Sequence, residues 1–316
     1  MADIDVVIPT WNGWEMLERC LVTLANQTAE HTVIVVDNGS SDGTVQRARE
    51  RFPAVTLVEL PENLGFGRAV NRGIEAGSAP FVVLVNNDVE LDPDFLERIV
   101  APLRADEGTG SVAGLLVVPG RERVDSYGIE IDRTLSSFAR FAGAPYPSTP
   151  LDEEHVAGPS GGAAAYRRRA LEEVGTFDEN LFAYMEDVDL ALRLRAAGWS
   201  AAGARDAVGV HLGGASFGVR SPWQVETYGT SRAYMLRKYG VLTSGVGRAA
   251  WALAMELGVV LVDILSPRGV AAVRGRVRGW TMARGVRASV PAEALNPQIG
   301  PREAFRRRFA VLRVET

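Results

Sequence analysis

The chain has 316 residues, of which 47% are hydrophobic and 23% charged, which is typical of a soluble globular protein with one large or two modest domains. A single cysteine, Cys20, excludes a disulfide framework and a cysteine metal cluster, and it fits a reducing cytoplasm. The net charge of −5 conceals an asymmetry, because residues 241–316 carry 12 arginines against 5 acidic residues, whereas the rest carries 22 basic against 34 acidic ones. An acidic body argues against nucleic acid as a partner, and the basic tail suits an anionic membrane surface.

Strands and helices alternate through the first hundred residues. Apolar runs predict strands at 4–8, 32–36, 55–60 and 81–85, and apolar residues at helical spacing predict helices at 14–26, 44–51 and 68–76. Cys20 falls in the apolar stripe of the first helix, so we expect it in the core. Strands joined by such helices form βαβ units, which predicts an α/β fold with a mostly parallel sheet and helices on both faces.

The pattern changes after residue 110. We expect strands at 111–118, 163–166 and 208–211, a helix at 168–174, a glycine-rich loop at 212–221, and an irregular, mobile excursion over the site at 119–157. From about residue 231 the chain reads as helical. The apolar stretch 249–265 is marginal for spanning a bilayer, so it is either buried, at a membrane interface, or part of a solvated basic helix.

These boundaries predict a domain over 1–230, with halves at 1–110 and 111–230, and a basic helical region over 231–316. The first residues lack the basic and long apolar regions of a signal peptide, so we expect a cytoplasmic protein, at most peripheral at the inner face of the membrane.

Asp88 follows the apolar strand 81–85, directly after Asn86 and Asn87. A carboxylate at the carboxyl end of a central strand is where open α/β sheets place ligand chemistry. We therefore expect Asp88 to bind a divalent metal that holds a diphosphate, and the alternative is a turn-capping aspartate. The next helix is expected to begin with Asp92 as its cap and Pro93 at its first position.

Asp37 ends the second predicted strand, beside the loop that follows the first. Its carboxylate can accept the imide N–H of uracil or thymine, and the alternative is a role in capping the turn after it. Asn63, Gly65 and Arg68 open a helix whose N-terminus favours anions, although Arg68 could equally be solvated.

Asp187 shares one helix face with an apolar stripe, so it is expected to point toward a cleft and to suit a general base. Asp189 is expected to point outward and pair with Arg193, four residues on. His211 ends a predicted strand; it is either a hydrogen-bonded core residue or a metal ligand together with Asp88.

Taken together, these motifs resemble the inverting, nucleotide-sugar-dependent glycosyltransferases of family 2, which have the GT-A fold. The similarity covers roughly residues 4–217 and depends on the motifs Val7–Asn12, Val36–Gly43, Asn63–Phe66 with Asn71, Asn86–Asp88, Gly175–Glu179, Glu186–Asp189 and His211. It implies that Asp37 recognises the base, Asp88 is the last carboxylate of the DxD metal motif, Asp187 is the catalytic base, and His211 binds metal or diphosphate. Here the motif reads Asn-Asn-Asp, so one carboxylate is lost. This variant and the arginine-rich C-terminal helices look most like the rhamnosyltransferase branch.

The resemblance implies transfer of a sugar, first L-rhamnose from dTDP-rhamnose, to a hydroxyl of a glycan or lipid-linked saccharide, with Mg2+ or Mn2+ as cofactor. The alternatives are a UDP-hexose donor, a nucleotidyltransferase, or a non-catalytic sugar-nucleotide-binding protein. The resemblance also implies that 1–230 is the catalytic domain, with a nucleotide-sugar half at 1–110 and an acceptor half at 111–230. The residues expected to bind the donor are Pro9, Thr10, Trp11, Asn12, Asp37, Asn63, Gly65, Arg68, Asn86 and Asn87. Those expected to contact the acceptor are Gly161, Gly162, Tyr184 and Glu186.

Overall fold

The computed structural model describes residues 2–213, 221–264 and 266–314. The first half contains β1 (Ile4–Thr10), α1 (Trp14–Ala25), β2 (Thr32–Asp37), α2 (Thr44–Arg51), β3 (Thr56–Glu59), α3 (Phe66–Ala76), β4 (Phe81–Val85), β5 (Val89–Leu91), α4 (Phe95–Ala105) and β6 (Thr109–Val117). The second half contains β7 (Val124–Tyr127), β8 (Ile129–Ile131), β9 (Ser137–Ala139), β10 (Ala163–Arg167), α5 (Arg168–Val174), α6 (Glu186–Ala196), β11 (Ser200–His211), α7 (Pro222–Lys238), α8 (Val246–Ile264), α9 (Gly269–Met282) and α10 (Pro301–Val314).

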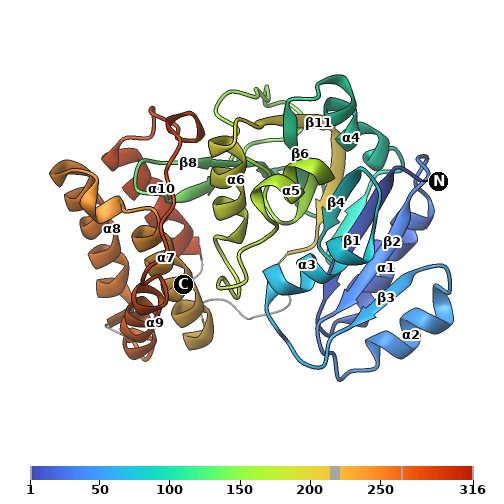
Figure 1. Ribbon diagram of the computed structural model, residues 1–316, viewed down its shortest axis with the longest axis horizontal. Helices are drawn as coiled ribbons and strands as arrows, with labels where there is room; N and C mark the ends of the chain where they lie inside the picture. Colours follow the sequence, from blue (N-terminus) through green and yellow to red (C-terminus); the bar gives the residue numbers. More distant parts are fainter. Residues whose placement is uncertain (1, 214–220, 265, 315–316) are drawn as a thin grey trace.

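One large sheet organises the molecule (Figure 1). Within the described residues nine strands join it, in the order β3-β2-β1-β4-β10-β6-β11-β5, with β7 paired to β6. β1 runs parallel to β2 and β4, and β2 parallel to β3, as predicted. β10 runs antiparallel between β4 and β6. The predicted α/β class is confirmed, and antiparallel strands complete the second half of the sheet.

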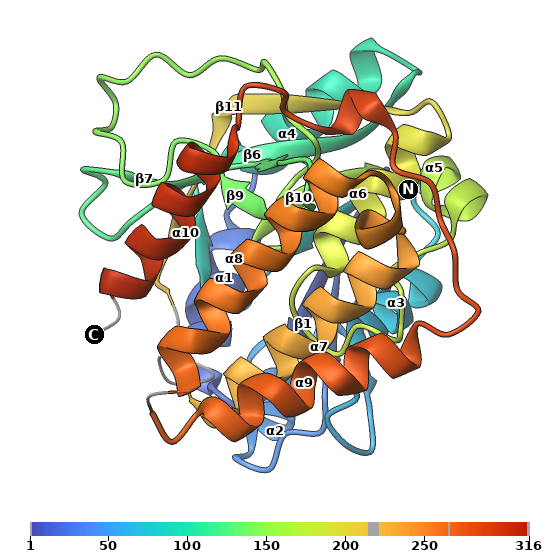
Figure 2. The same ribbon diagram turned by 90° about the vertical axis from the view of Figure 1, so that its left-hand side faces the viewer.

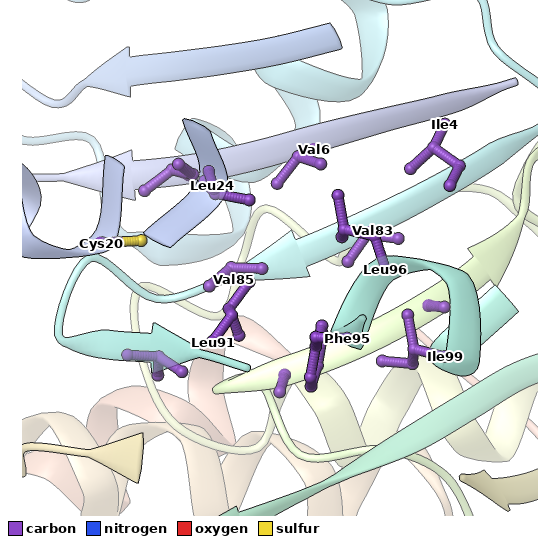
Figure 3. Packing of buried hydrophobic residues seen from close by; sticks show 14 of the residues in the cluster. Ile4, Val6, Cys20, Leu24, Val83, Val85, Leu91, Phe95, Leu96 and Ile99 are labelled. Atoms are coloured by element: carbon purple, nitrogen blue, oxygen red, sulfur yellow. The ribbon is translucent and has the colours of Figure 1, made fainter. Parts of the chain in front are cut away.

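Alternate residues of the buried strands face opposite sides of the sheet, which is why both faces are covered by helices. Val6 and Val83 face the layer formed by α1 and α4, where Cys20 and Phe95 are also buried (Figure 3). Val7, the residue after Val6 in β1, faces the opposite layer, which contains α3, α5 and α6. The prediction that Cys20 is a core residue is confirmed.

The segment 119–157 is not the irregular excursion that we predicted. β7 joins the main sheet, β8 and β9 pair with each other, and Tyr127 and Ile131 are fully buried. The prediction failed because these apolar alternations are too short, and too interrupted by Gly128, to be told from loop by pattern. β11 is longer than the predicted strand 208–211. A register shift between Ala204 and Val208 interrupts its pairing with β6, and we predicted only the part after this shift.

The helix after β4 begins later than expected. Val89–Leu91 form strand β5, antiparallel to β11, and the first helical residue is Phe95. The side chain of Asp92 does not cap this helix, because it accepts a hydrogen bond from Arg121 Nη1 at 3.0 Å. The predicted cap at Asp92 and first position at Pro93 are therefore wrong.

Helices α7 to α10 form the C-terminal part of the molecule, at the left of Figure 1 and nearest the viewer in Figure 2. α7 begins at Pro222 rather than near residue 231, because Ser221 and Gln224 form a capping box: Gln224 N–H donates to Ser221 Oγ at 3.2 Å, and Ser221 N–H donates to Gln224 Oε1 at 3.0 Å. Residue 230, where we predicted the first domain to end, thus lies within one continuous helix. Of the helices described, none combines the length and apolarity needed to cross a membrane.

Candidate active site

The carboxyl ends of β1, β2 and β4 meet at one edge of the sheet. Thr10 lies opposite Asp37 in the register of β1 and β2, and Pro9 is buried one position earlier, opposite Val36. Asn87, just after β4, donates from Nδ2 to Thr10 Oγ1 at 2.9 Å. The predicted donor-side residues Pro9, Thr10, Asp37 and Asn87 are therefore close neighbours.

Asp37 has one carboxylate oxygen engaged and one available. Oδ2 accepts a hydrogen bond from the Ser40 N–H at 3.0 Å, which is the turn-capping role that we weighed as an alternative. Oδ1 is buried, and it finds no donor in the described part of the chain. A buried acceptor without a donor is costly, so this oxygen suits a ligand N–H such as that of a pyrimidine base.

The loops after β1 and β2 are tied together by hydrogen bonds. Asn12 N–H donates to Ser40 Oγ at 2.7 Å, and Asn12 Oδ1 accepts from the Ser41 N–H at 3.0 Å. Trp11, beside Asn12, is 37% exposed at the rim of this edge. The two loops thus form one wall, with an aromatic ring at its margin.

The loop before α3 is shaped by other parts of the protein. Asn63 Oδ1 accepts from Asn38 Nδ2 and from the Gly65 N–H, both at 3.0 Å, so this side chain orders the loop. A Cβ on Gly65 would lie 2.5 Å from the carbonyl oxygen of Phe182, so only glycine fits against that backbone. Arg68 lies 3.3 Å from Glu179 in an exposed ion pair.

Two connections join this loop and α3 to the acceptor half. The Phe66 N–H donates to the Phe182 carbonyl at 2.7 Å. The buried Asn71 amide clamps the backbone of Phe177: Nδ2 donates to its carbonyl at 2.9 Å, and Oδ1 accepts from its N–H at 3.0 Å. The donor-side loop and the segment 177–182 therefore hold one another in place.

Asp88 and His211 are brought together, as predicted. His211 Nε2 lies 3.4 Å from Asp88 Oδ2, and His211 Nδ1 lies 2.9 Å from Asp125 Oδ2. Burial alone would lower the pKa of His211, but the hydrogen bonds to Asp125 and Asp88 raise it to about 10. Asp125 was missed in the sequence because it lies in β7, within the segment read as irregular.

The residues at Asp88 fit a divalent cation. Asp88 Oδ1 is buried and has no hydrogen-bond donor among the residues described, while the neutral form of His211 would offer Nε2 as a ligand. His211 would then donate its other ring N–H to Asp125, the usual second-sphere partner of a metal-binding histidine. Groups of three or more acidic, histidine or cysteine side chains placed to hold a metal do not occur in the described chain, so substrate oxygens or water would complete the coordination.

A short chain of contacts connects this edge to Asp187. The Asn86 N–H donates to the Gly162 carbonyl at 3.1 Å, and the backbone N–H of the neighbouring Gly161 helps to stabilise the Asp187 carboxylate by lowering its pKa. Asp187 Oδ1 also accepts from the Val188 N–H at 2.8 Å, at the start of α6. Asp187 thus lies next to the turn that packs against the residues around Asp88, and not on an outer surface.

Glu186 and Asp187 are two neighbouring carboxyl groups at the start of α6 that influence each other's ionisation. Burial raises the pKa of Asp187, while backbone N–H groups, including those of Val188 and Gly161, oppose the rise by stabilising its carboxylate. Burial, and then the charge of Asp187, raise the pKa of Glu186 to about 8. Glu186 Oε2 is buried without a donor in the described residues. At neutral pH Glu186 therefore keeps its proton, while the backbone donors favour the charged form of Asp187.

The backbone before these carboxylates is strained. Tyr184 has a φ of 67° and Met185 a φ of 71°, both in the left-handed region that residues other than glycine avoid. Such strain is typical of functional sites held in place by the surrounding fold. The Tyr184 ring lies 5.9 Å from that of Tyr228 in α7, so α7 supports the predicted acceptor side.

Asp189 does not point outward as predicted. It is fully buried, and its carboxylate contacts Arg193 Nε at 2.7 Å, Lys238 Nζ at 2.5 Å and the Tyr239 hydroxyl at 2.9 Å. The prediction failed because α6 is buried on two sides, between the sheet and α7 (Figure 1). Asp178 Oδ2 accepts from the same lysine at 2.7 Å, so Lys238 anchors α6 and the segment before it to α7.

The carboxylates gather at the carboxyl ends of parallel strands, which is where open α/β sheets bind ligands. Residues 5–175 match the family described as glycosyl transferase family 2, so the chain belongs to that family and is a glycosyltransferase.

Two relatives illustrate the range of the family. The chain is 34% identical over 228 residues to an N-acetylglucosaminyl-diphospho-decaprenol L-rhamnosyltransferase of Mycobacterium tuberculosis, a match that covers 63% of this chain and 73% of the relative. It is 28% identical over 218 residues to the glycosyltransferase AglE of Haloferax volcanii, with 66% of each chain covered.

Solved structures confirm the fold. The mannosyltransferase PcManGT from Pyrobaculum calidifontis, in complex with GDP-Man and Mn2+, superposes with a TM-score of 0.55 at 20% identity, covering 88% of this chain and 87% of that one. GalNAc-T7 with UDP, GalNAc and Mn2+ gives a TM-score of 0.64 at 14% identity, covering 91% of this chain and 55% of that one. The GT-A-like fold predicted from the motifs is confirmed.

Proposed function

We propose that the chain transfers L-rhamnose from dTDP-rhamnose, with inversion, to a hydroxyl of a lipid-linked saccharide or glycan. The observation that carries this proposal is a pair of buried carboxylate oxygens, Asp37 Oδ1 and Asp88 Oδ1, which have no donor in the described chain. They lie at the ends of β2 and β4, the two strands that flank β1. A pyrimidine nucleoside diphosphate offers an N–H to one and cation-bound phosphates to the other.

The relative from Mycobacterium tuberculosis supports the choice of sugar and acceptor. Its name specifies L-rhamnose as the transferred sugar and a diphospho-decaprenol-linked N-acetylglucosamine as the acceptor. A polyprenyl-linked acceptor would hold the enzyme at a membrane, so peripheral contact through residues 231–316 is part of the proposal. A UDP-hexose is the second candidate donor, because Asp37 would accept the imide N–H of uracil as readily as that of thymine.

On the donor side, the Asp37 carboxylate accepts the imide N–H, and the wall formed by the β1 and β2 loops packs against the base. The hydrogen bond between Asn87 and Thr10 holds the turn after β4 in place. Asp88 and His211 would hold Mg2+ or Mn2+, which when bound neutralises charge on the leaving diphosphate. Asp125 is a positioning residue, since it fixes the ring of His211 through Nδ1.

On the acceptor side, Asp187 is the general base. It removes the proton of the acceptor hydroxyl while that oxygen forms a bond to the anomeric carbon and the bond from this carbon to the diphosphate breaks. The raised pKa of Asp187 makes it a stronger base than an exposed aspartate. Because Glu186 is neutral, Asp187 is the charged member of the pair. The O–H of the Glu186 carboxyl group can donate to an acceptor oxygen.

The remaining acceptor contacts come from the turn at 161–162 and from aromatic rings. Tyr184 precedes the two carboxylates directly, and the rings of Phe182 and Trp223 lie 5.8 Å apart in an edge-to-face pair. Phe182 is 37% exposed and Trp223 41% exposed, so both rings offer apolar faces on which a sugar can pack. The acceptor saccharide would lie over these rings with its hydroxyl toward Asp187.

Donor binding is tested by thermal shift of the purified chain with Mn2+ and a panel of dTDP-, UDP- and GDP-sugars. A ligand at about a hundred times its Kd should stabilise the protein by about 2.7 kcal/mol, and dTDP-rhamnose should give the largest shift. Asp37→Ala should abolish the preference for the pyrimidine. If no sugar nucleotide shifts the melting temperature, the proposal fails at its first step. Turnover is measured separately, as release of dTDP with and without an acceptor.

A further inference from the structure

α8 exposes a ridge of large apolar side chains to solvent. Ala252, Met255 and Val259 are buried against the rest of the molecule. The opposite face carries Val246, Leu253, Leu257, Leu261 and Ile264, whose exposed fractions are 88%, 48%, 61%, 59% and 51%. The ridge runs the whole helix, about 27 Å at 1.5 Å per residue. α8 is therefore apolar on its buried face and on its exposed face, unlike a normal surface helix, whose solvent face is polar.

α9 exposes a second ridge. Ala272, Gly275 and Gly279 face α7, where a Cβ on Gly275 would lie 2.2 Å from the carbonyl oxygen of Glu226, so the two helices are in close backbone contact. Away from this seam lie Val270, Val273, Val277 and Trp280, with exposed fractions of 69%, 47%, 61% and 39%.

The two ridges lie on the same side of the helix pair. α9 follows α8 in the chain and runs back in roughly the opposite direction, both near the viewer in Figure 2, and Arg276 of α9 contacts Glu256 of α8 at 2.8 Å. Viewed from the N-terminus of each helix, the ridge lies about one residue step, roughly 100°, around the axis from the residue that makes this contact. The direction of that rotation is the same for both helices. In an antiparallel pair this places both ridges on one face, and together they form what we call the α8–α9 face.

The charges around the α8–α9 face are mostly positive, although Glu226 of α7 lies 3.5 Å from Arg274. Arg274, Arg278, Arg284 and Arg287 are exposed on or just after α9. Residues 246–287 contain two acidic residues, Glu256 and Asp263. Glu256 is turned toward Arg232 and Arg276, and Asp263 is 1% exposed and pairs with Arg268.

We propose that the α8–α9 face lies in the headgroup–acyl interface of an anionic phospholipid bilayer. An apolar surface flanked by arginines and without an exposed carboxylate is the pattern of a helix that rests in the membrane plane. Anionic headgroups supply the charges that the arginines need, and acyl chains cover the leucine and valine side chains. This inference deepens the proposed function and rests on it in one respect: a lipid-linked acceptor is presented at such a surface.

The test is co-sedimentation with vesicles of phosphatidylcholine, with and without phosphatidylglycerol. The parent chain should bind the anionic vesicles, and binding should weaken as salt is added. Leu257→Glu with Leu261→Glu should weaken the partition by about a hundredfold, because two leucine side chains no longer enter the bilayer. Arg278→Gln with Arg284→Gln should weaken it by about thirtyfold on anionic vesicles and little on neutral ones.

Matched controls are Val22→Glu on α1, which replaces a side chain that is 46% exposed, and Arg47→Gln on α2, which removes an exposed arginine. Both should bind vesicles as the parent does. Circular dichroism of all variants establishes that they are folded. Equal binding by the parent and the double leucine variant would overturn the proposal. So would a dimer, seen by light scattering, that dissociates in that variant while neither protein binds vesicles, because a second copy would then cover the face.

Calorimetry of dTDP-rhamnose binding in Mn2+ keeps the two proposals apart. A chain that binds the donor but ignores vesicles refutes the membrane surface and leaves the proposed function intact. A chain that binds vesicles but no sugar nucleotide refutes the proposed function and leaves the membrane surface.

Discussion

Replacing Glu186 by glutamine tests the electrostatics of the site through protein stability. Glu186 is 9% exposed, and burial together with the charge of Asp187 raises its pKa from the ordinary 4.5 to about 8. Between pH 4.5 and 8 the folded protein keeps a proton that the unfolded chain has lost. The free energy of unfolding therefore falls as pH rises through this window, by about 1.4 kcal/mol per pH unit and by at most about 5 kcal/mol in all.

Glu186→Gln carries a neutral amide of the same shape, so it does not take part in this loss. The variant and the parent should have similar melting temperatures at pH 4.5, and the variant should be more stable at pH 8. At about 2 °C per kcal/mol for a chain of this size, the difference at the higher pH reaches up to about 10 °C.

Differential scanning fluorimetry from pH 4.5 to 8 measures this difference. Glu172→Gln is the matched control, because it removes an exposed glutamate of α5. A melting-temperature difference between Glu186→Gln and the parent that stays constant across the pH range would refute the reasoning, since the buried glutamate would then not hold its proton.

Three further outcomes are expected. Asp187→Asn should lower turnover by about 10²- to 10⁴-fold, the range for loss of a general base, with donor affinity unchanged in calorimetry; full activity would remove the base assignment. Asp88→Ala should weaken donor binding in Mn2+, and chelation of the metal should weaken binding by the parent but not by this variant. Lys238→Met should destabilise the fold by about 3–5 kcal/mol in denaturant unfolding, because Asp178 and Asp189 lose a cation that lies 2.7 and 2.5 Å from them. An unfolding free energy equal to that of the parent would mean that this buried network contributes nothing.

The parts of the site that the sequence predicted share one physical signal. Asp37 and Asp88 each end a continuous apolar run, and a buried strand that stops at a carboxylate can be recognised without knowing its neighbours. The resemblance to a family then supplied the long-range pairing of Asp88 with His211, which lie on strands far apart in the sequence. Secondary-structure propensity and hydrophobic periodicity alone do not predict that contact.

The failures have equally specific causes. Asp125 lies in a strand of four residues, β7, whose alternation is too short to stand out from the loops beside it. Asp189 was assigned to the wrong side because helical periodicity identifies one apolar face, whereas α6 packs against the sheet and against α7. What covers the second face of a helix is decided by tertiary structure, here by the helices after residue 221.

The paired amide bonds between Asn71 and Phe177, and the bond from Phe66 to Phe182, have a consequence for engineering. A chimaera that takes its sugar-donor half from one homologue and its acceptor half from another would divide both connections between two parents. Such a recombinant should be assembled with the stretch 63–71 and the stretch 177–182 inherited together, even though about a hundred residues of chain separate them. A crossover point chosen near the middle of the polypeptide would separate these two stretches, which hold each other in place.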